Sequence, residues 1–240
     1  MCCARVSGWK FRIKSRFAFG WNTYAVIFDH TKVKIKLDFK NIYILRHGET
    51  DFNKRGIVQG KGIDAPLNAL GLWQADKFYQ AYKNIKFDKI YVSTLQRTFQ
   101  TVGRFIESGI PYQKLSGLDE IDWGVWEGKI LNTESNKYYA ETIRKWTSGN
   151  TSYAIDGGES PQMVKDRQIE ALDIILAQEA ESEVLICMHG RAMRILFPTL
   201  LNVPLKDMDL FQHSNTSLYQ FRYEAGEFKM LKENILTHLD

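Results

Sequence analysis

The stretch Ile42-Tyr43-Ile44-Leu45-Arg46-His47-Gly48-Glu49-Thr50 decides the fold of this 240-residue chain. Four apolar residues are followed at once by an arginine, a histidine and a glycine. A short apolar run bounded by a glycine-containing turn is typical of a buried parallel strand. Charged side chains at the end of such a strand cost desolvation free energy unless an anion or a partner group meets them. The stretch therefore predicts a parallel sheet with a polar ligand crevice beside the end of the strand.

Two further apolar runs of the chain end in a similar way. Residues 184–188 are followed by His189-Gly190, and residues 89–92 are followed by a helical pattern with Arg97 in its first turn. Strand carboxyl ends meet at one edge of a parallel sheet, so we expect these side chains to converge with Arg46 and His47. Taken singly, each also has a plain interpretation, as a solvated helix charge or a hydrogen-bonded loop histidine.

Strands alternate with helices from residue 41 onward. Asn68 is a good N-cap for one helix, and Ser160-Pro161 marks the start of another. Residues 133–147 are also expected to be helical, and residues 218–223 and 228–231 suggest a closing hairpin. This order predicts an α/β fold in which a mainly parallel sheet carries helices on both faces, giving three layers. The short connections predict a single domain over residues 41–240.

The first forty residues differ from the rest in charge. They hold nine Lys/Arg and two Asp/Glu, whereas the remaining 200 residues hold 23 Lys/Arg and 26 Asp/Glu. We interpret residues 1–40 as a basic N-terminal extension of unassigned role. A mildly acidic body does not favour a nucleic-acid partner, and no stretch is long enough to span a membrane. Cys2, Cys3 and Cys187 form no disulfide framework or zinc motif, which favours a reducing, cytoplasmic location.

Two arginines, two histidines and a helix N-terminus at one crevice predict a site for a phosphate-sized anion. The guanidinium fork of arginine matches two phosphate oxygens at once, and a helix N-terminus offers free N–H groups.

Leu45-Arg46-His47-Gly48-Glu49-Thr50 resembles the signature of the histidine phosphatase superfamily, which includes the cofactor-dependent phosphoglycerate mutases. Further matches follow in the family's order, and the resemblance covers about residues 41–220. The matching residues are Asn53, Gly56, Gln59-Gly60, Asp64, Pro66-Leu67-Asn68, Gly71, Ser93, Arg97, Gln100-Thr101, Leu118-Asp119-Glu120, Gly124 to Gly128, Gly157 to Ser160 and His189-Gly190. The resemblance implies a phosphoglycerate mutase-like fold.

The resemblance also implies a mechanism through a transient phosphohistidine. His47 would attack phosphorus as a neutral imidazole. Arg46, Arg97 and His189 would hold the phosphoryl oxygens, and Glu120 would protonate the leaving oxygen and later deprotonate water. The residues implied to contact the substrate are Asn53, Gln59, Gly60 and Asn215.

The family contains phosphatases and mutases, and two departures favour a phosphatase. Only 28 residues separate Gly128 from Gly157, where the mutases carry a long insertion over the site, and Glu120 to Gly124 differs from their polar segment. We therefore expect a metal-independent, acid-type hydrolase of small phosphate esters that needs no cofactor. The alternatives are a phosphoglycerate mutase and an inactive member that binds phosphorylated ligands. Oligomeric state and natural substrate are not indicated.

Overall fold

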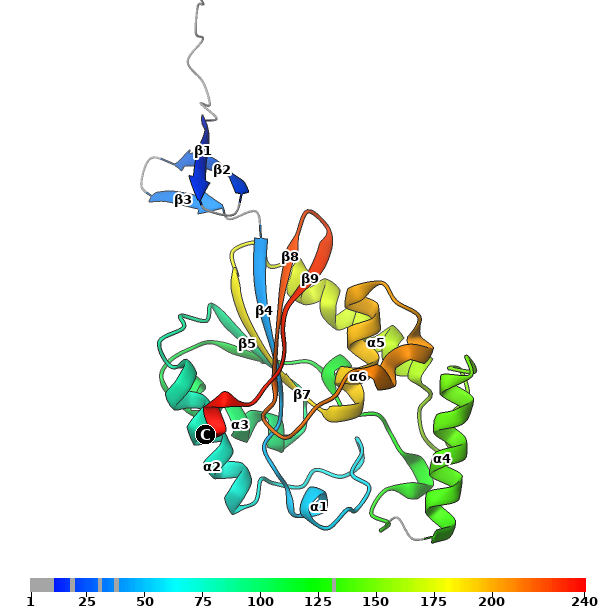
Figure 1. Ribbon diagram of the computed structural model, residues 1–240. Coiled ribbons are helices and arrows are strands. Elements are labelled where there is room, and N and C mark those ends of the chain that lie inside the picture. Colours follow the sequence, from blue (N-terminus) through cyan, green and yellow to red (C-terminus); the bar gives the residue numbers. More distant parts are fainter. Residues whose placement is uncertain (1–10, 18–19, 30–31, 37–38, 131–132) are drawn as a thin grey trace, which may run out of the picture.

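The computed structural model describes residues 11–17, 20–29, 32–36, 39–130 and 133–240. Its strands form two sheets, one of three strands and one of six (Figure 1). The three-stranded sheet is antiparallel and consists of β1 (Phe11–Phe17), β2 (Gly20–Asp29) and β3 (Lys32–Lys36). Most of the extension predicted over residues 1–40 thus has β structure of its own, while residues 1–10 of it lie outside the described part.

The six-stranded sheet has the strand order β6-β5-β7-β4-β8-β9. Its strands are β4 (Phe39–Arg46), β5 (Lys89–Val92), β6 (Tyr112–Lys114), β7 (Glu183–Met188), β8 (Leu218–Glu224) and β9 (Glu227–Ile235). The four strands β6, β5, β7 and β4 are mutually parallel, whereas β8 and β9 form an antiparallel hairpin beside β4. The prediction of a mainly parallel sheet with a closing hairpin is confirmed.

Strand β4 begins earlier than the apolar run suggested. It starts at Phe39, so Phe39 and Lys40 pair with β8 as part of the main sheet and not of the extension. Lys40 is buried, and its ammonium group donates to the carbonyls of Ile175 and Gln178, 2.9 Å from each. A lysine with two carbonyl acceptors can occupy a buried strand, which the apolar pattern could not reveal.

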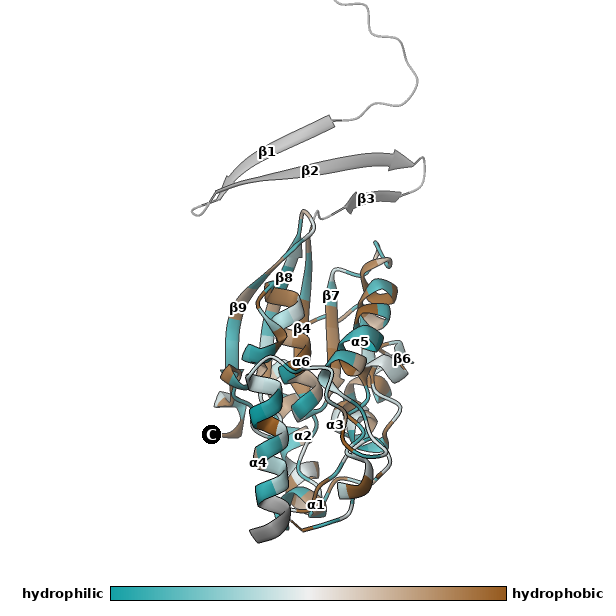
Figure 2. Ribbon diagram, turned by 90° about the vertical axis from the view of Figure 1, so that its right-hand side faces the viewer, coloured by the Kyte–Doolittle hydropathy of each residue, from teal (hydrophilic) through white to brown (hydrophobic). Residues whose placement is uncertain are grey.

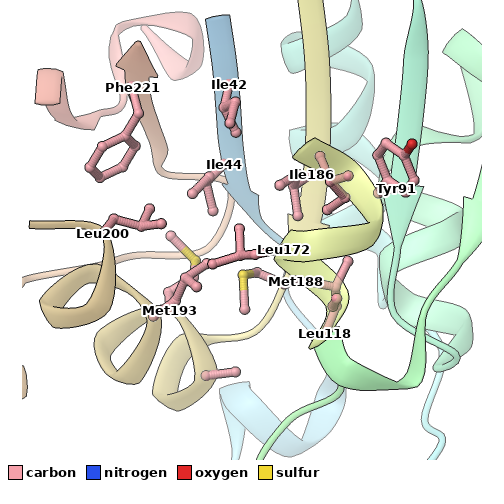
Figure 3. Packing of buried hydrophobic residues seen from close by; sticks show 14 of the residues in the cluster. Ile42, Ile44, Tyr91, Leu118, Leu172, Ile186, Met188, Met193, Leu200 and Phe221 are labelled. Atoms are coloured by element: carbon pink, nitrogen blue, oxygen red, sulfur yellow. The ribbon is translucent and has the colours of Figure 1, made fainter. Parts of the chain in front are cut away.

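Helices cover both faces of this sheet, as predicted. Alternate side chains of β4 point to opposite faces, because strand side chains have a period of two. Tyr43 and Leu45 belong to one core cluster with α2 (Ala69–Tyr82) and α3 (Gln96–Glu107). Ile42 and Ile44 belong to the other, with α5 (Pro161–Leu176) and α6 (Gly190–Leu201), as Figure 3 shows.

The predicted helix boundaries hold closely. Asn68 caps α2 and Ser160 caps α5, each accepting a backbone N–H with its side chain. The expected helix over residues 133–147 is α4 (Thr133–Thr147). Helix α6 contains Pro198 and continues past it to Leu201. The short helix α1 (Asp51–Lys54), which follows Thr50, was not predicted. Short 3₁₀ helices span Ser116–Leu118, Gly124–Trp126, Leu205–Leu210 and Thr237–Leu239.

Hydropathy follows this layering. The strands β4 and β7 are largely hydrophobic, and α4 presents more hydrophilic residues (Figure 2). Among the described helices, none combines the length and the apolar character that a membrane crossing requires.

Candidate active site

The register of two parallel strands brings the two predicted histidines together. Arg46 of β4 lies level with Met188 of β7, so His47 and His189 leave the sheet side by side. Their ring centroids are 5.1 Å apart. Strand β5 pairs with β7 one place further along the sheet, and Ser93 at its end bonds to the ring of His189. Three strand ends thus converge, as the sequence predicted.

His47 is buried, with 3% of its surface exposed. Its Nδ1 lies 2.7 Å from the carbonyl oxygen of Gly48, which can only accept, so Nδ1 carries the hydrogen. The other nitrogen, Nε2, therefore has a free lone pair, and the ring lines a cavity. Burial and the charges of Arg97 and Arg46 hold the pKa of His47 well below its usual value. The imidazole is consequently neutral at physiological pH, which a nucleophile requires.

Arg46 and Gln59 present buried donors to the site. Nε of Arg46 and Nε2 of Gln59 are both buried, and neither has a hydrogen-bond acceptor in the part of the chain that the structure describes. Both side chains line the same cavity as His47. A buried N–H group without an acceptor costs free energy, so two of them at one cavity indicate that an anion or polar ligand completes the site.

Arg97 and His189 form a layer behind His47. Nε of Arg97 donates to Nδ1 of His189 at 3.1 Å, and its terminal nitrogens donate to the carbonyls of Ile63 and Gly60. Nε2 of His189 lies 2.8 Å from the hydroxyl of Ser93, so both ring nitrogens have partners. Burial and the charge of Arg97 lower the pKa of His189 well below its usual value. Neither Arg97 nor His189 lines either of the two cavities described below.

Glu120 lies at the N-terminus of α6. Its carboxylate accepts backbone N–H groups from Ile121, Arg191 and Ala192 at 2.8–3.1 Å. The N-terminus of a helix favours a negative group, and these bonds fix both carboxylate oxygens. The side chain is 7% exposed and lines the cavity of His47.

A partly buried ion pair holds the segment that carries Glu120. Arg167 forms a bidentate pair with Glu159, in which Nε and Nη2 each donate to a different carboxylate oxygen at 2.9 Å. The same guanidinium donates to the carbonyls of Gly117, Asp119 and Glu120, at 2.9 Å each. Glu159 in turn accepts the backbone N–H of Asp122. The family-like segment Gly157 to Ser160 thus braces the loop before and after Glu120.

The remaining predicted contact residues lie on loops around His47. Asn53 forms a capping box with Thr50, and Asn215 donates to the carbonyl of His47 at 3.0 Å and to Asn53 at 3.3 Å. Asn53 and Asn215 both line a cavity. Gly60 lines neither of the two cavities described below. Its carbonyl accepts a hydrogen bond from Arg97, and a Cβ atom at position 60 would lie 2.0 Å from a carboxylate oxygen of Glu127. Gly60 therefore permits close packing of its loop.

Two adjoining cavities meet beside His47. One has a volume of about 310 Å³ and the other about 400 Å³, and both are lined by Arg46, Asn53, Gln59, Trp123 and Tyr139. The smaller also includes Arg191, Arg194 and His213, and the larger adds Ile57 and Val58.

Five of the lining side chains were not among the predicted site residues: Trp123, Tyr139, Arg191, Arg194 and His213. Arg191 and Arg194 lie within four residues after Gly190, a spacing that places both on one side of the helix after His189. That signal was available in the sequence. Tyr139 and His213 come from distant segments, and only packing brings them to the site.

Within the described residues, no group of three or more His, Cys, Asp or Glu side chains is arranged to hold a metal ion. The charged groups of the site are mainly guanidinium groups, which suit an anion.

A family model for the histidine phosphatase superfamily (branch 1) matches residues 42–236. The chain belongs to this superfamily. It is 30% identical over 199 residues to phosphoserine phosphatase 1 of Hydrogenobacter thermophilus, covering 82% of this chain and 93% of that protein. It is also 30% identical to the probable phosphoglycerate mutase GpmB of Salmonella choleraesuis, covering 78% of this chain and 86% of that protein.

A solved structure has the same fold. The phosphoserine phosphatase mutant of Entamoeba histolytica in complex with phosphoserine has a TM-score of 0.72 and 26% identity, covering 84% of this chain and all of that one. The fold predicted from the strand and helix order, together with the superfamily suggested by residues 45–50, is thereby confirmed.

Proposed function

We propose that this chain hydrolyses small phosphomonoesters through a phosphohistidine on His47. The observation that carries the proposal is the free Nε2 of a neutral, buried His47 beside two unpartnered donors, Arg46 Nε and Gln59 Nε2. A nucleophile and the donors for an anion share one cavity. The phosphatase names of superfamily relatives support the same reaction class.

In the first step, the lone pair of His47 Nε2 forms a bond to phosphorus while the bond from phosphorus to the ester oxygen breaks. Protonated Glu120 gives its proton to that oxygen, which leaves as an alcohol. Arg46 and Gln59 donate to the phosphoryl oxygens as charge builds on them. Asn53 and Asn215 hold the loops around His47. Arg97 supplies positive charge near His47, and its bond to the neutral ring of His189 holds both side chains in place.

In the second step, a water oxygen attacks the phosphorus of phospho-His47 and gives a proton to Glu120. The bond between nitrogen and phosphorus breaks, inorganic phosphate leaves, and Glu120 is protonated again. No metal ion takes part in either step, so added metal is not required.

The decisive test is trapping of the intermediate. Brief incubation with a ³²P-labelled phosphomonoester in the presence of EDTA should label the protein with acid-labile, base-stable phosphate on His47. A His47→Ala variant should take up no label and turn over at least 1,000-fold more slowly, because the covalent route is lost. Full turnover by His47→Ala would refute the mechanism, and activity abolished by EDTA would refute the metal-independent reaction.

Mutase activity is the alternative outcome. A mutase returns the phosphoryl group to a second oxygen of the same carbon skeleton and must keep water from phospho-His47. Release of inorganic phosphate without added bisphosphoglycerate supports the hydrolase. Interconversion of 2- and 3-phosphoglycerate that depends on a bisphosphorylated cofactor would support the mutase instead. Binding of phosphorylated ligands without any turnover would identify an inactive member.

A further inference from the structure

The lining of the His47 cavity includes Arg194 and His213, which the proposed reaction does not use. Arg194 lies on the second turn of α6, and His213 lies in the loop before β8. We propose that Arg194 and His213 bind a carboxylate on the alcohol part of the substrate. The preferred substrates are then small phosphorylated hydroxy acids. This inference rests on the hydrolase function proposed above and narrows its substrate class.

Two nitrogens of the Arg194 guanidinium are hydrogen-bonded within the protein, and the third, Nη2, can bind a ligand. Its Nε donates to the carbonyl of Phe211 at 3.0 Å, and its Nη1 lies 2.9 Å from a carboxylate oxygen of Asp209. Among the described residues, its Nη2 has no acceptor. The side chain is 20% exposed and lines the cavity. A guanidinium fixed on two sides loses little conformational freedom when its third nitrogen binds an anion.

His213 presents a second donor. Arg46 can only donate, and its Nη1 lies 3.2 Å from Nδ1 of His213, so the neutral ring carries its hydrogen on Nε2. A Cβ at position 190 would lie 2.6 Å from Cε1 and 3.0 Å from Nε2 of this ring, so Gly190 lets the ring pack against the start of α6. Burial and the adjacent charges of Arg46 and Arg194 lower the pKa of His213 to about 2, which keeps the ring neutral.

The lining of the cavity favours anionic groups. Three guanidinium groups, those of Arg46, Arg191 and Arg194, line it. Asp209 pairs with Arg191 at 2.5 Å and with Arg194 at 2.9 Å, so these two guanidinium groups share one carboxylate. A carboxylate on the substrate fits the remaining nitrogen of Arg194 and the ring N–H of His213, because each of its two oxygens can accept a hydrogen bond.

An aromatic wall limits the size of the alcohol part. Trp123 and Tyr139 line the cavity with ring centroids 5.5 Å apart. Arg191 donates to the hydroxyl of Tyr139 at 3.1 Å and lies over the ring of Trp123 at 5.9 Å, so both rings are fixed. A fixed wall in a cavity of about 310 Å³ suits a carbon skeleton of a few atoms.

The test compares substrates that differ in a single group. The protein should hydrolyse 3-phosphoglycerate with a kcat/KM about 10- to 100-fold above that for glycerol 3-phosphate, because a charge-assisted hydrogen bond is gained. The two esters differ only in a carboxylate against a hydroxymethyl group. A second pair, propane-1,3-diol bisphosphate and its monophosphate, tests a second phosphate in the same subsite.

Variants locate the subsite. Arg194→Gln should lower the ratio of the two kcat/KM values about tenfold, whereas Arg194→Lys, which keeps the charge, should retain most of it. Arg104→Gln is the matched control, because Arg104 is exposed on α3 and does not line the cavity; its ratio should equal that of the wild type. His213→Gln should lower the ratio less than Arg194→Gln does. The wild-type ratio tests the proposal even if a variant fails to fold.

A wild-type ratio near one would overturn the carboxylate subsite while leaving the hydrolase function intact. An equal ratio in Arg194→Gln and wild type would overturn the role of Arg194. A stronger preference for the bisphosphate than for the carboxylate would assign the subsite to phosphate and refute our choice. If no phosphomonoester were hydrolysed and His47 took up no label, the proposed function itself would fail.

Discussion

Arg167 offers a way to disturb Glu120 without touching the cavity. Its guanidinium binds the carbonyls of Asp119 and Glu120 and pairs with Glu159, while its side chain lines neither cavity. Substitution by lysine keeps the positive charge but loses the fork that reaches Glu159 and the loop carbonyls together. We expect Arg167→Lys to fold and to let the carboxylate of Glu120 move.

The magnitude follows from the bonds that are lost. Removing the cation altogether would leave the partly buried Glu159 without its partner, at a cost of up to about 3–5 kcal/mol of stability. Lysine avoids that cost but gives up two or more hydrogen bonds, each worth roughly 1 kcal/mol, so we expect a loss of about 2 kcal/mol. General acid catalysis contributes roughly 10²–10⁴-fold, and a displacement of about 1 Å can cost about 100-fold.

The assay separates acid catalysis from general damage. We expect kcat/KM for glycerol 3-phosphate, an alkyl ester that needs its leaving oxygen protonated, to fall about 100-fold in Arg167→Lys. For p-nitrophenyl phosphate, whose phenolate leaves without a proton, we expect a fall of less than about threefold. Because kcat/KM reports steps up to formation of phospho-His47, hydrolysis of the intermediate does not confuse the comparison.

Glu120→Gln provides the reference. It should show the same selective loss toward the alkyl ester, and adding Arg167→Lys to it should change the ratio of the two substrates no further. An equal fall of kcat/KM for both substrates in Arg167→Lys would refute the positioning role. So would additive effects of the two substitutions, since these would place Arg167 outside the action of Glu120.

Other expectations follow from the same geometry. His47, His189 and His213 have pKa values below those of the unfolded chain, so the unfolded state binds protons first as the pH falls below about 6.5. The free energy of unfolding should therefore fall by about 1.4 kcal/mol for each histidine between pH 7.5 and 5.5, measured by urea denaturation; a flat profile would contradict their neutral state. Gly190→Ala places a Cβ atom 2.6 Å from Cε1 of His213 and should lower kcat/KM at least tenfold. At Gly103 an added Cβ atom would meet, beyond its chain neighbours and its own helix backbone, no atom of the described residues within 4 Å, so Gly103→Ala should stabilise α3 by about 0.5–1 kcal/mol. Thermal melts and initial rates of the two variants check this pair, and equal rates would count against the contact. Dialysis against EDTA should leave the rate of phosphate release unchanged; loss of activity that Zn²⁺ or Mg²⁺ restores would contradict the mechanism.

Much of the architecture was predictable because local signals agreed with the tertiary structure. The apolar run before Arg46 predicted a buried strand, and Asn68 and Ser160 marked helix starts that their capping bonds now explain. Parallel pairing then placed His47 and His189 at one edge, since strand ends in a parallel sheet meet.

What could not be predicted depends on packing between distant segments. Tyr139 of α4 and His213 reach the cavity through contacts that leave no periodic signal in the sequence. Arg97 is held by hydrogen bonds to the backbone carbonyls of Gly60 and Ile63. Because every residue has a backbone carbonyl, the sequence does not indicate which ones hold a given arginine. Sequence alone could show which side chains converge but could not rank them by their distance from a ligand.

The first strand of the main sheet limits how the basic segment ahead of it can be separated from the enzyme body. Lys40 closes the carboxyl end of α5 through two carbonyls, and a cation at that end of a helix is favourable. A chain shortened to begin at residue 41 would leave both carbonyls without their buried donor. Cutting ahead of Phe39 keeps them paired. Removal of the residues ahead of the main sheet, by truncation or by proteolysis, should therefore preserve these two bonds only where the cut leaves β4 whole.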